Sequence, residues 1–331
     1  MTYKVVITDY EFATLAPEEE VLSQIDVEFV RAQCKTEEEV IEAAKDAEAL
    51  LNQYAPISRR VIENLPNLKV VSRYGVGVNT IDVKAATENG VIVGNVTDYC
   101  MDEVSDHAFA LLIASARKVV MLNEAVKGGN WDYKVGVPIY RLRGQVLGLV
   151  GLGRIPQTLA KKAQAFGMKI LAYDPYVPAE VAKEINVELV DLNEMCAQSD
   201  YISVHAPLIE ATQGMISDSQ FDAMKKEAFI INTARGPVID ESALIRALES
   251  DKIAGAALDV VEDEPILQDN PLLKMENVIL NPHVAWYSEE AQLELKRKTA
   301  QNVVDVLSGY YPTYLFNREV TNKVQLKQKE S

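Results

Sequence analysis

The sequence predicts an α/β protein with two doubly wound parallel sheets, one in each of two domains. The chain of 331 residues is longer than one hydrophobic core usually organises. Short runs rich in valine and isoleucine alternate with helical patterns, and this alternation is typical of parallel strands joined by helical crossovers. The alternation occurs in two separate series, which is why we expect two sheets.

The first series occupies the first hundred residues. Helical patterns such as 36–47 and 58–65 separate its runs. Each run is short and apolar, as expected of a strand buried in a parallel sheet. The predicted strands are 4–10 (KVVITDY), 27–33 (VEFVRAQ), 48–53 (EALLNQ), 68–75 (LKVVSRYG) and 91–96 (VIVGNV).

The second series begins at residue 145 and repeats the rhythm of strand and helix. Its runs predict a second parallel sheet. The predicted strands are 145–151 (QVLGLVG), 168–174 (MKILAYD), 187–190 (VELV), 201–207 (YISVHAP), 228–234 (AFIINTA), 254–261 (AGAALDVV) and 277–283 (NVILNPH).

Two long helical patterns connect the series. The pattern 101–129 lies between them and carries the chain from one domain to the other. The pattern 288–310 follows the last strand without a strand partner of its own, so we expect it to return and cover the first domain. The second domain is then an insertion into the first. The predicted domains are 1–99 with 287–331, and 100–286, with hinges near 97–101 and 286–289.

Composition excludes several classes of partner. Acidic residues outnumber basic ones by 49 to 33, and the net charge of −16 repels nucleic-acid backbones and anionic membranes. Three widely spaced cysteines form no metal-ligand pattern, so we expect free thiols and no metal site. Because no apolar stretch approaches the roughly 18 residues of a membrane span, we expect a cytoplasmic protein.

The segment VGLGRIPQ, residues 150–157, has most of the glycine pattern that binds a dinucleotide pyrophosphate. A predicted strand precedes it, a helical pattern follows, and a second strand ends at Asp174, about 20 residues on. Gly151 permits the tight turn, and Gly153 lets the backbone approach the pyrophosphate. This context predicts that the loop binds a nicotinamide dinucleotide.

Pro156 stands where the pattern has its third glycine. In a first helical turn its fixed φ suits the helix, and its missing N–H has no helical partner in any case. We therefore expect only a small shift of the helix, with the N–H groups of Arg154 and Ile155 still facing the anion. Asp174 is expected to bind the adenosine ribose and to repel a 2′-phosphate, which favours NAD over NADP.

The three histidines limit the choice of a general acid/base. His107 lies in an apolar helical pattern and is interpreted as a core or interdomain residue. His205, two residues before Pro207, ends a predicted strand and is assigned to the nucleotide pocket. His283 ends the last strand, where open α/β sheets place their ligands, and faces the predicted cleft.

Arg235, Asp259 and Glu264 also lie at the carboxyl ends of strands of the second series. Reduction of a 2-oxo acid requires a paired carboxylate, a polarised carbonyl and a proton delivered as hydride arrives. An arginine, a histidine and a carboxylate that keeps the imidazole protonated meet these needs.

The motifs together resemble those of the D-isomer-specific 2-hydroxyacid dehydrogenases over nearly the whole chain. They are the glycine loop, NTARG (232–236), ALDVVEDEP (257–265) and NPHVAWYSEEA (281–291), in this order. The resemblance implies a Rossmann NAD domain inserted into a flavodoxin-like substrate domain.

The same resemblance implies roles for individual residues. Arg235 orients the substrate, His283 is the general acid/base, and Glu264 raises the basicity of His283. Asp259 supports the cofactor and the arginine. The remaining residues that the resemblance places at the cofactor are Thr233 and Ala234.

SRYGVGVNTID (72–82) resembles the family loop that grips the substrate carboxylate, here through the N–H groups of Val76 and Gly77. Its glycines allow close approach. The family more often has Asp-Asn where this chain has Asn79 and Thr80, and an ordinary turn is the alternative interpretation.

The substrate is predicted to be a small unphosphorylated 2-oxo acid, with pyruvate and D-lactate as the specific hypothesis. 3-Phosphoglycerate dehydrogenases carry basic residues for the phosphate where this chain has Gln53 and Tyr54. Reduction of glyoxylate or hydroxypyruvate, or oxidation of 3-phosphoglycerate, remains the alternative. The aromatic residues interpreted either as walls of the substrate pocket or as hinge packing are Tyr54, Tyr99 and Trp286.

Two expectations concern assembly and class. The string His-x-x-Trp-Tyr-Ser-Glu most resembles a branch that contains the C-terminal-binding-protein corepressors, so an NAD-sensing scaffold is the alternative to an enzyme. The pattern FALLIASARKVV (109–120) has more apolar residues than one domain face requires. In the family this region makes the twofold dimer, and we expect a homodimer.

Overall fold

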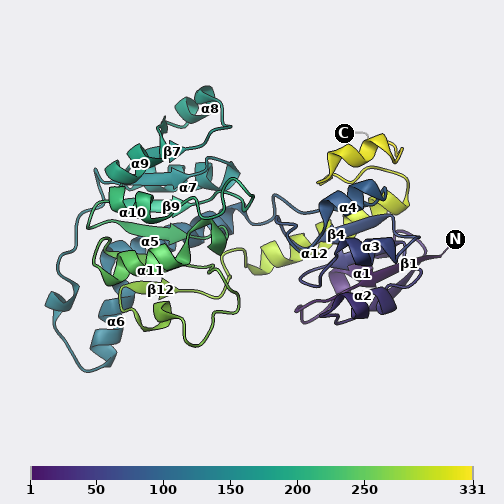
Figure 1. The fold of residues 1–331 in the computed structure, drawn as a ribbon, viewed down its shortest axis with the longest axis horizontal. Helices are drawn as coiled ribbons and strands as arrows, with labels where there is room; N and C mark the ends of the chain where they lie inside the picture. Colours follow the sequence, from purple (N-terminus) through teal and green to yellow (C-terminus); the bar gives the residue numbers. More distant parts are fainter. Residues whose placement is uncertain (1, 330–331) are drawn as a thin grey trace. The chain divides into compact units, whose positions relative to one another are not determined.

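The structure of the protein is a computed structural model that describes residues 2–329. The chain divides into two units, each with its own sheet (Figure 1). Unit 1 comprises the described residues of Met1–Tyr99 and Ser288–Ser331, and unit 2 comprises Cys100–Tyr287. This division differs from the expected domains only at Tyr287, which lies in unit 2. Which ligand each domain binds remains a prediction.

Unit 1 contains a parallel sheet of five strands in the order β2-β1-β3-β4-β5. This order is the doubly wound arrangement of flavodoxin, so the predicted fold class of this unit is confirmed. Each of the five predicted runs coincides with one strand, and only β1 begins one residue before its predicted run. The strands are β1 (Tyr3–Ile7), β2 (Val27–Arg31), β3 (Ala49–Asn52), β4 (Val70–Arg73) and β5 (Ile92–Gly94).

The helices of unit 1 cover this sheet. Helix α12 returns from unit 2 and packs on α1 and on strands β3, β4 and β5, as predicted from its lack of a strand partner. Residues Leu295 and Val303 are among those it buries. The helices are α1 (Ala16–Leu22), α2 (Glu37–Ala43), α3 (Arg59–Glu63), α4 (Val83–Glu88), α12 (Glu289–Leu307) and the 3₁₀ helix η4 (Arg318–Asn322).

Unit 2 contains a parallel sheet of seven strands in the order β12-β11-β10-β9-β6-β7-β8. Strands β6 to β8 are added in one direction across the sheet, and β9 to β12 are added in the other direction from β6. This order is the Rossmann arrangement extended by one strand. Each predicted run again contains one strand. The strands are β6 (Val146–Val150), β7 (Lys169–Tyr173), β8 (Glu188–Leu189), β9 (Tyr201–Val204), β10 (Phe229–Asn232), β11 (Gly255–Leu258) and β12 (Val278–Leu280).

One predicted helix of unit 2 is wrong in extent. The pattern 101–129 forms two helices, because Lys118 adopts the left-handed conformation with φ of 52° and interrupts the hydrogen bonding. The other helices follow strands. The helices are α5 (Met101–Arg117), α6 (Val119–Lys127), α7 (Arg154–Ala165), α8 (Ala179–Glu184), α9 (Leu192–Gln198), α10 (Asp218–Ala223), α11 (Glu241–Glu249), and the 3₁₀ helices η1 (Tyr133–Gly136), η2 (Gly236–Val238) and η3 (Pro271–Lys274).

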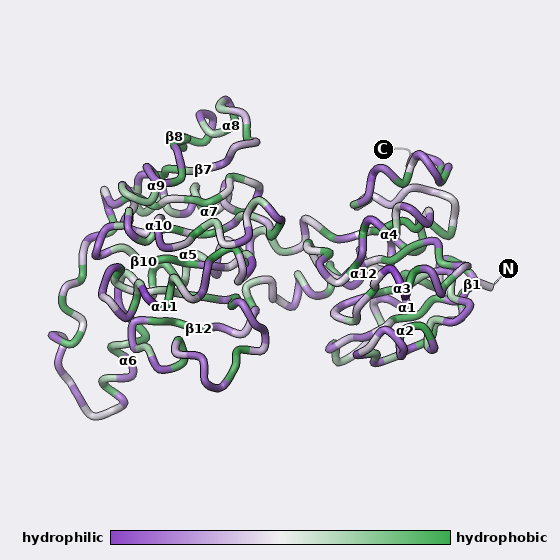
Figure 2. The backbone as a smooth tube through the Cα atoms, viewed as in Figure 1, coloured by the Kyte–Doolittle hydropathy of each residue, from purple (hydrophilic) through white to green (hydrophobic). Residues whose placement is uncertain are grey.

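The core of unit 2 lies on both faces of the sheet. Successive strand residues point to opposite faces, so Ile230 joins one hydrophobic cluster and Ile231 joins the other. Leu112 of α5 and Leu159 of α7 belong to the second cluster. Figure 2 shows the hydrophobic residues gathered along central strands such as β10. This burial holds the strands rigidly, and the loops after their carboxyl ends gather at one edge of the sheet.

Two further expectations concern the whole chain. The three cysteines are buried free thiols, as predicted. Within residues 2–329, no helix combines the length and the apolar character that crossing a membrane requires.

Candidate active site

The glycine loop of unit 2 connects β6 to α7. Gly151 has φ of 94°, a left-handed conformation that strains any residue with a side chain. A Cβ at this position would also lie 3.3 Å from the backbone nitrogen of Ala206, in the loop after β9. Gly153 precedes the first residue of α7, and a Cβ there would meet no atom within 4 Å. The loop is therefore tight at Gly151 and open at Gly153.

Pro156 lies in the first turn of α7, as predicted, and its ring is buried. The N–H of Gln157 donates to the Gly153 carbonyl at 3.1 Å, so the helical hydrogen bonds begin one residue after the proline. Pro156 therefore breaks no hydrogen bond. Within residues 2–329, the N–H groups of Gly153, Arg154 and Ile155 have no acceptor. Three donors at the start of a helix form a site suited to an anion.

Asp174 ends β7 and ties the glycine loop to the next turn. Its carboxylate accepts hydrogen bonds from the backbone N–H groups of Leu152 at 2.8 Å, Tyr176 at 2.8 Å and Val177 at 3.0 Å. The spacing of the motif predicted a ribose-binding residue, but it did not reveal this bridge. The carboxylate keeps lone pairs for a ligand, since each oxygen can accept more than one bond.

Thr233 and His205 flank the same edge of the sheet. The Thr233 hydroxyl oxygen is buried and, within the described residues, has no hydrogen-bond partner. His205 follows β9, and its Nε2 lies 2.8 Å from the Ser203 hydroxyl. Burial lowers the pKa of His205 from 6.5 to about 3, so its ring is neutral at physiological pH. Pro207 is exposed two residues later, and the Ala234 N–H donates to the Asn232 side chain at 3.0 Å.

These features fit a dinucleotide. Gly153 leaves open the space that a Cβ would fill, the N–H groups of the first turn lack acceptors, and Thr233 has an unpaired buried hydroxyl. An unpaired buried polar group costs free energy unless a ligand or water satisfies it. The residues that would hold the cofactor are therefore Gly151, Gly153, Arg154, Ile155, Asp174 and Thr233.

His283 and Glu264 form a hydrogen-bonded pair. The Nδ1 atom of His283 lies 2.6 Å from a carboxylate oxygen of Glu264, and the two side chains are 40% and 36% exposed. The pair comes from different loops, because Glu264 follows β11 and His283 follows β12. An Nδ1–H that donates to Glu264 leaves Nε2 of His283 directed to other groups.

The pKa of Glu264 is lowered from 4.5. Partial burial raises this pKa, but the hydrogen bond and charge of His283, the Val261 N–H and the charge of Arg235 together outweigh it. Glu264 is therefore ionised throughout the neutral range. An ionised carboxylate that accepts the Nδ1–H holds the imidazole ring of His283 in one orientation.

The backbone of His283 is left-handed, with φ of 54°. A non-glycine residue in this conformation is strained, and such strain persists only where the surroundings impose it. Asp259 supplies that constraint. Its buried carboxylate accepts the N–H groups of Val284 and Ala285, both at 2.9 Å, and its carbonyl accepts the His283 N–H at 2.8 Å.

Arg235 follows β10 and is held close to the loop after β11. Its carbonyl accepts a bond from the Asn232 side chain at 3.0 Å, and one guanidinium nitrogen donates to the Ala234 carbonyl at 2.5 Å. A Cβ on Gly236 would lie 1.8 Å from the Val261 carbonyl oxygen, so only glycine allows these loops to meet. Unit 2 thus brings Arg235, Glu264 and His283 into one charged cluster.

The predicted carboxylate loop of unit 1 follows β4. Gly75 has φ of 116°, and within residues 2–329 the N–H groups of Val76 and Gly77 have no acceptor. The Val76 carbonyl accepts a bond from the Asn95 side chain at 2.7 Å. The Thr80 hydroxyl donates to Asn52 at 2.9 Å, which anchors the loop despite the departure from the family's Asp-Asn. Two adjacent unpaired N–H groups suit a carboxylate.

The aromatic candidates differ in environment. Tyr99 is buried, and its hydroxyl lies 3.6 Å from the position of a Cβ on Gly75, beside the carboxylate loop. Tyr54 is 54% exposed at the end of β3, where Asp9 accepts its N–H at 2.5 Å. Trp286 belongs to unit 2 and makes an edge contact with Tyr287, with ring centroids 5.6 Å apart.

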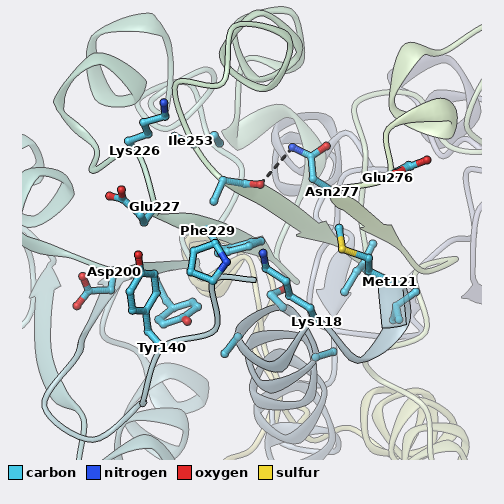
Figure 3. Close-up of a pocket in the computed structure, with 18 of the residues that line it drawn as sticks. Lys118, Met121, Tyr140, Asp200, Lys226, Glu227, Phe229, Ile253, Glu276 and Asn277 are labelled. Carbon is cyan, nitrogen blue, oxygen red and sulfur yellow. Dashed lines mark hydrogen bonds between the residues drawn. The ribbon is translucent and has the colours of Figure 1, made fainter. Parts of the chain in front are cut away.

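A cavity of about 360 Å³ opens at the other edge of the unit 2 sheet, where the strands begin. Figure 3 labels Asp200, Phe229 and Asn277 among its lining residues, and these lie at the amino ends of β9, β10 and β12. None of the predicted site residues lines this cavity. It is therefore separate from the glycine loop and the His283 cluster.

Comparison with known proteins identifies the family. Residues 109–285 match the model of the D-isomer specific 2-hydroxyacid dehydrogenase, NAD binding domain. The chain belongs to this family. The match confirms the predicted resemblance and the NAD-binding character of unit 2, and it makes the chain a member of a family of NAD-dependent oxidoreductases.

Individual relatives differ in substrate. The chain is 46% identical over 278 residues to D-3-phosphoglycerate dehydrogenase from Methanocaldococcus jannaschii, covering 83% of this chain and 52% of that protein. It therefore spans about half the length of that relative. It is 42% identical over 285 residues to glyoxylate reductase from Korarchaeum cryptofilum, covering 85% of this chain and 86% of that protein.

A solved structure of the family has the same fold. D-lactate dehydrogenase from Aquifex aeolicus, complexed with NAD and lactic acid, superimposes with a TM-score of 0.84 at 28% identity. The alignment covers 97% of this chain and 98% of that one. The fold is thus common to family members that act on different acids, so the fold alone does not determine the substrate.

Proposed function

We propose that the protein is an NAD-dependent dehydrogenase of a small D-2-hydroxy acid, which reduces the corresponding unphosphorylated 2-oxo acid. The observation that carries the proposal is the pair of His283 and Glu264, joined at 2.6 Å at the carboxyl edge of the sheet that also carries the glycine loop. A histidine oriented by an ionised carboxylate is the arrangement expected of a general acid/base.

Each residue of the candidate site has a separate role in the proposed reduction. NADH, when bound, supplies the hydride that reduces the carbonyl carbon. Nε2 of His283 donates the proton that the carbonyl oxygen takes up as it becomes a hydroxyl. The guanidinium of Arg235 stabilises the negative charge that develops on that oxygen and orients the substrate carboxylate. In unit 1, the N–H groups of Val76 and Gly77 are suited to bind a carboxylate.

An unphosphorylated substrate is supported by the charges of unit 1. Gln53 is buried and accepts the Glu11 N–H at 3.1 Å, so the end of β3 offers no cation. Arg59 forms ion pairs with Glu63 at 3.3 Å and with Glu88 at 2.8 Å. Arg60 is likewise paired with acidic residues of α2. These arginines are already neutralised on the surface of the unit and are poor ligands for a phosphate.

The small size of the substrate is supported by the relatives. Glyoxylate reductase from K. cryptofilum matches this chain over 86% of its own length. Lactate is the acid in the complex of the Aquifex enzyme. We propose a 2-oxo acid of two or three carbons, with pyruvate as the first candidate and glyoxylate and hydroxypyruvate as its competitors. Oxidation of 3-phosphoglycerate is the second candidate, because the relative with that activity is 46% identical.

The test is NADH oxidation by the purified protein with pyruvate, glyoxylate, hydroxypyruvate, phenylpyruvate and 3-phosphohydroxypyruvate. We expect turnover of at least about one per second on a small unphosphorylated acid. We expect His283→Ala to lower kcat at least about 100-fold while NADH still binds. Preference for the phosphorylated acid would refute the substrate proposal. Tight NADH binding without turnover on any acid would instead support an NAD-sensing scaffold.

We also propose that the protein is a homodimer joined through residues 118–141, which we call the arm. The arm contains α6, which buries none of its residues, and Figure 1 shows it extending away from the sheet of unit 2. Trp131 and Tyr133 in the arm are 89% and 76% exposed. Exposed aromatic residues on an extended segment are typical of interfaces. A monomeric mass in light scattering at micromolar concentration would refute the dimer.

A further inference from the structure

We propose that His107 is a positioning residue for the reaction. It projects from α5 and holds Asp259 and Asn281, the residues that flank the strained turn carrying His283. The inference rests on the proposed function, in which His283 is the general acid/base. From its sequence pattern, His107 was interpreted only as a core or interdomain residue.

The geometry of His107 defines its partners. Its Nε2 atom lies 3.2 Å from the side-chain oxygen of Asn281 and 3.5 Å from a carboxylate oxygen of Asp259. Both neighbours are acceptors, so the tautomer with a proton on Nε2 donates to Asn281 and directs its N–H toward the Asp259 carboxylate. A quarter of the His107 side chain is exposed, whereas the Asp259 side chain is entirely buried. His107 therefore donates into a site that solvent does not reach.

Asp259 requires this donor because its charge is buried. Two backbone N–H groups, those of Val284 and Ala285, already bind the carboxylate. A buried carboxylate is costly unless hydrogen-bond donors surround it. The Nε2 atom of His107 lies 3.5 Å from this carboxylate and adds a third N–H beside it. Loss of His107 would remove this N–H and the bond that it donates to Asn281.

The same contacts determine the position of His283. Asn281 is two residues before it and is held to β11 by a bond from its N–H to the Leu258 carbonyl at 2.9 Å. Asp259 binds His283 and the two residues after it, as described above. His107 thus contacts Asn281, before His283, directly, and is linked through Asp259 to the residues after His283. If Asp259 and Asn281 move, the left-handed backbone of His283 loses the restraints that maintain it.

Helix α5 is a rigid platform for this contact. It packs against β10 and β11, and Ala108 and Leu112, one and five residues after His107, are buried. β11 ends immediately before Asp259, so the helix and the carboxylate belong to one packed layer. The position of His107 is therefore set by the packing of the core.

The experiment compares two substitutions. His107→Leu removes the donor, whereas His107→Gln places an amide N–H near the position of Nε2. We expect kcat to fall about tenfold in His107→Leu and to remain within about threefold of the parent in His107→Gln, because a small misplacement of a catalytic group is costly. The dissociation constant for NADH, measured by fluorescence, should change less than about twofold in both. If His107→Leu does not fold, His107→Asn, whose amide is too short to reach, replaces it.

A matched control lies on the same turn of α5. Asp106→Asn breaks the ion pair of Asp106 with Lys162 of α7, whose atoms are 2.6 Å apart, and touches no residue near His283. We expect its kcat to remain within about twofold of the parent, as usual for an exposed pair. An unchanged kcat in His107→Leu would overturn the inference. A kcat in His107→Gln as low as in His107→Leu would also overturn it, because the effect would then come from packing.

A double mutant separates this inference from the proposed function. In a His283→Ala background, we expect His107→Leu to change the residual rate less than about twofold, because a positioning residue acts only through the group it positions. A further tenfold loss would overturn the inference and leave the role of His283 intact. Near-normal turnover of His283→Ala alone would refute the proposed function.

Discussion

Asp259→Asn tests whether a buried charge maintains the turn that carries His283. The amide has the shape of the carboxylate but only one acceptor oxygen. In the parent, the two carboxylate oxygens accept separate bonds from Val284 and Ala285, both at 2.9 Å. After the substitution, one of these N–H groups faces an amide NH₂ group, which cannot accept it.

The expected loss of unfolding free energy follows from these two hydrogen bonds. A hydrogen bond to a charged group contributes about 1.5–3 kcal/mol, and a buried donor left unpaired costs about 1–3 kcal/mol. Since the side chain of Asp259 is fully buried, water does not replace the lost partner. We therefore expect the free energy of unfolding of unit 2 to fall by about 3–5 kcal/mol, as for the removal of one member of a buried charged set. We also expect kcat to fall at least about tenfold, because the restraint on His283 is lost.

The assay is urea-induced unfolding followed by tryptophan fluorescence. Both tryptophans of the chain, Trp131 and Trp286, belong to unit 2, so the signal reports on that unit. The control is Asp222→Asn, which removes an exposed ion pair with Lys252. We expect it to change the free energy by no more than about 0.5 kcal/mol. A loss below about 1 kcal/mol in Asp259→Asn would refute the reasoning, because the carboxylate would then not sustain the turn.

Three further predictions concern the cofactor site. Asp174→Ala should narrow the preference for NADH over NADPH. It should also destabilise the protein by about 1–3 kcal/mol, because three backbone N–H groups lose their acceptor. An unchanged ratio of kcat/KM for the two cofactors would mean that other residues determine the cofactor preference. Pro156→Gly should tighten NADH binding in a fluorescence titration. It should lower the thermal midpoint, since glycine raises the conformational entropy of the unfolded chain and so stabilises that state by about 1 kcal/mol. Equal or weaker binding of NADH would mean that the loop has adapted to proline. His205 has a folded pKa of about 3 against 6.5 unfolded, so the unfolded chain binds more protons between these values and stability falls as the pH drops below about 6.5. By pH 5 this loss reaches about 2 kcal/mol, and His205→Gln should remove that part of the pH dependence of unfolding; a parallel pH profile in the variant would contradict it.

Local sequence patterns predicted the strands and their alternation with helices along the chain. Each of the twelve predicted runs coincides with a strand to within one residue at the start of β1, because a buried parallel strand is marked by its own short apolar sequence. The break at Lys118 was not readable. Helical periodicity continues on both sides of it, and the left-handed conformation arises where α5 leaves the sheet and the arm begins.

Local sequence patterns were sufficient to predict the fold class, the position of the glycine loop and the residue types of the candidate site. These depend on short segments such as 150–157 and on motifs whose spacing is local. The sequence also indicated that Pro156 is tolerated, because the first turn of a helix has no hydrogen bond for a proline to break.

The contacts by which the candidate residues restrain one another arise only in the folded chain. Asp174 bridges the glycine loop, Asp259 holds the left-handed turn at His283, and His107 contacts that turn from a helix more than a hundred residues earlier in the chain. No local pattern predicts such contacts, because they join segments that become neighbours only when the strands take their places in the sheet. The physical reason is burial: a charge such as that of Asp259 must be matched by whichever donors the packed core brings to it.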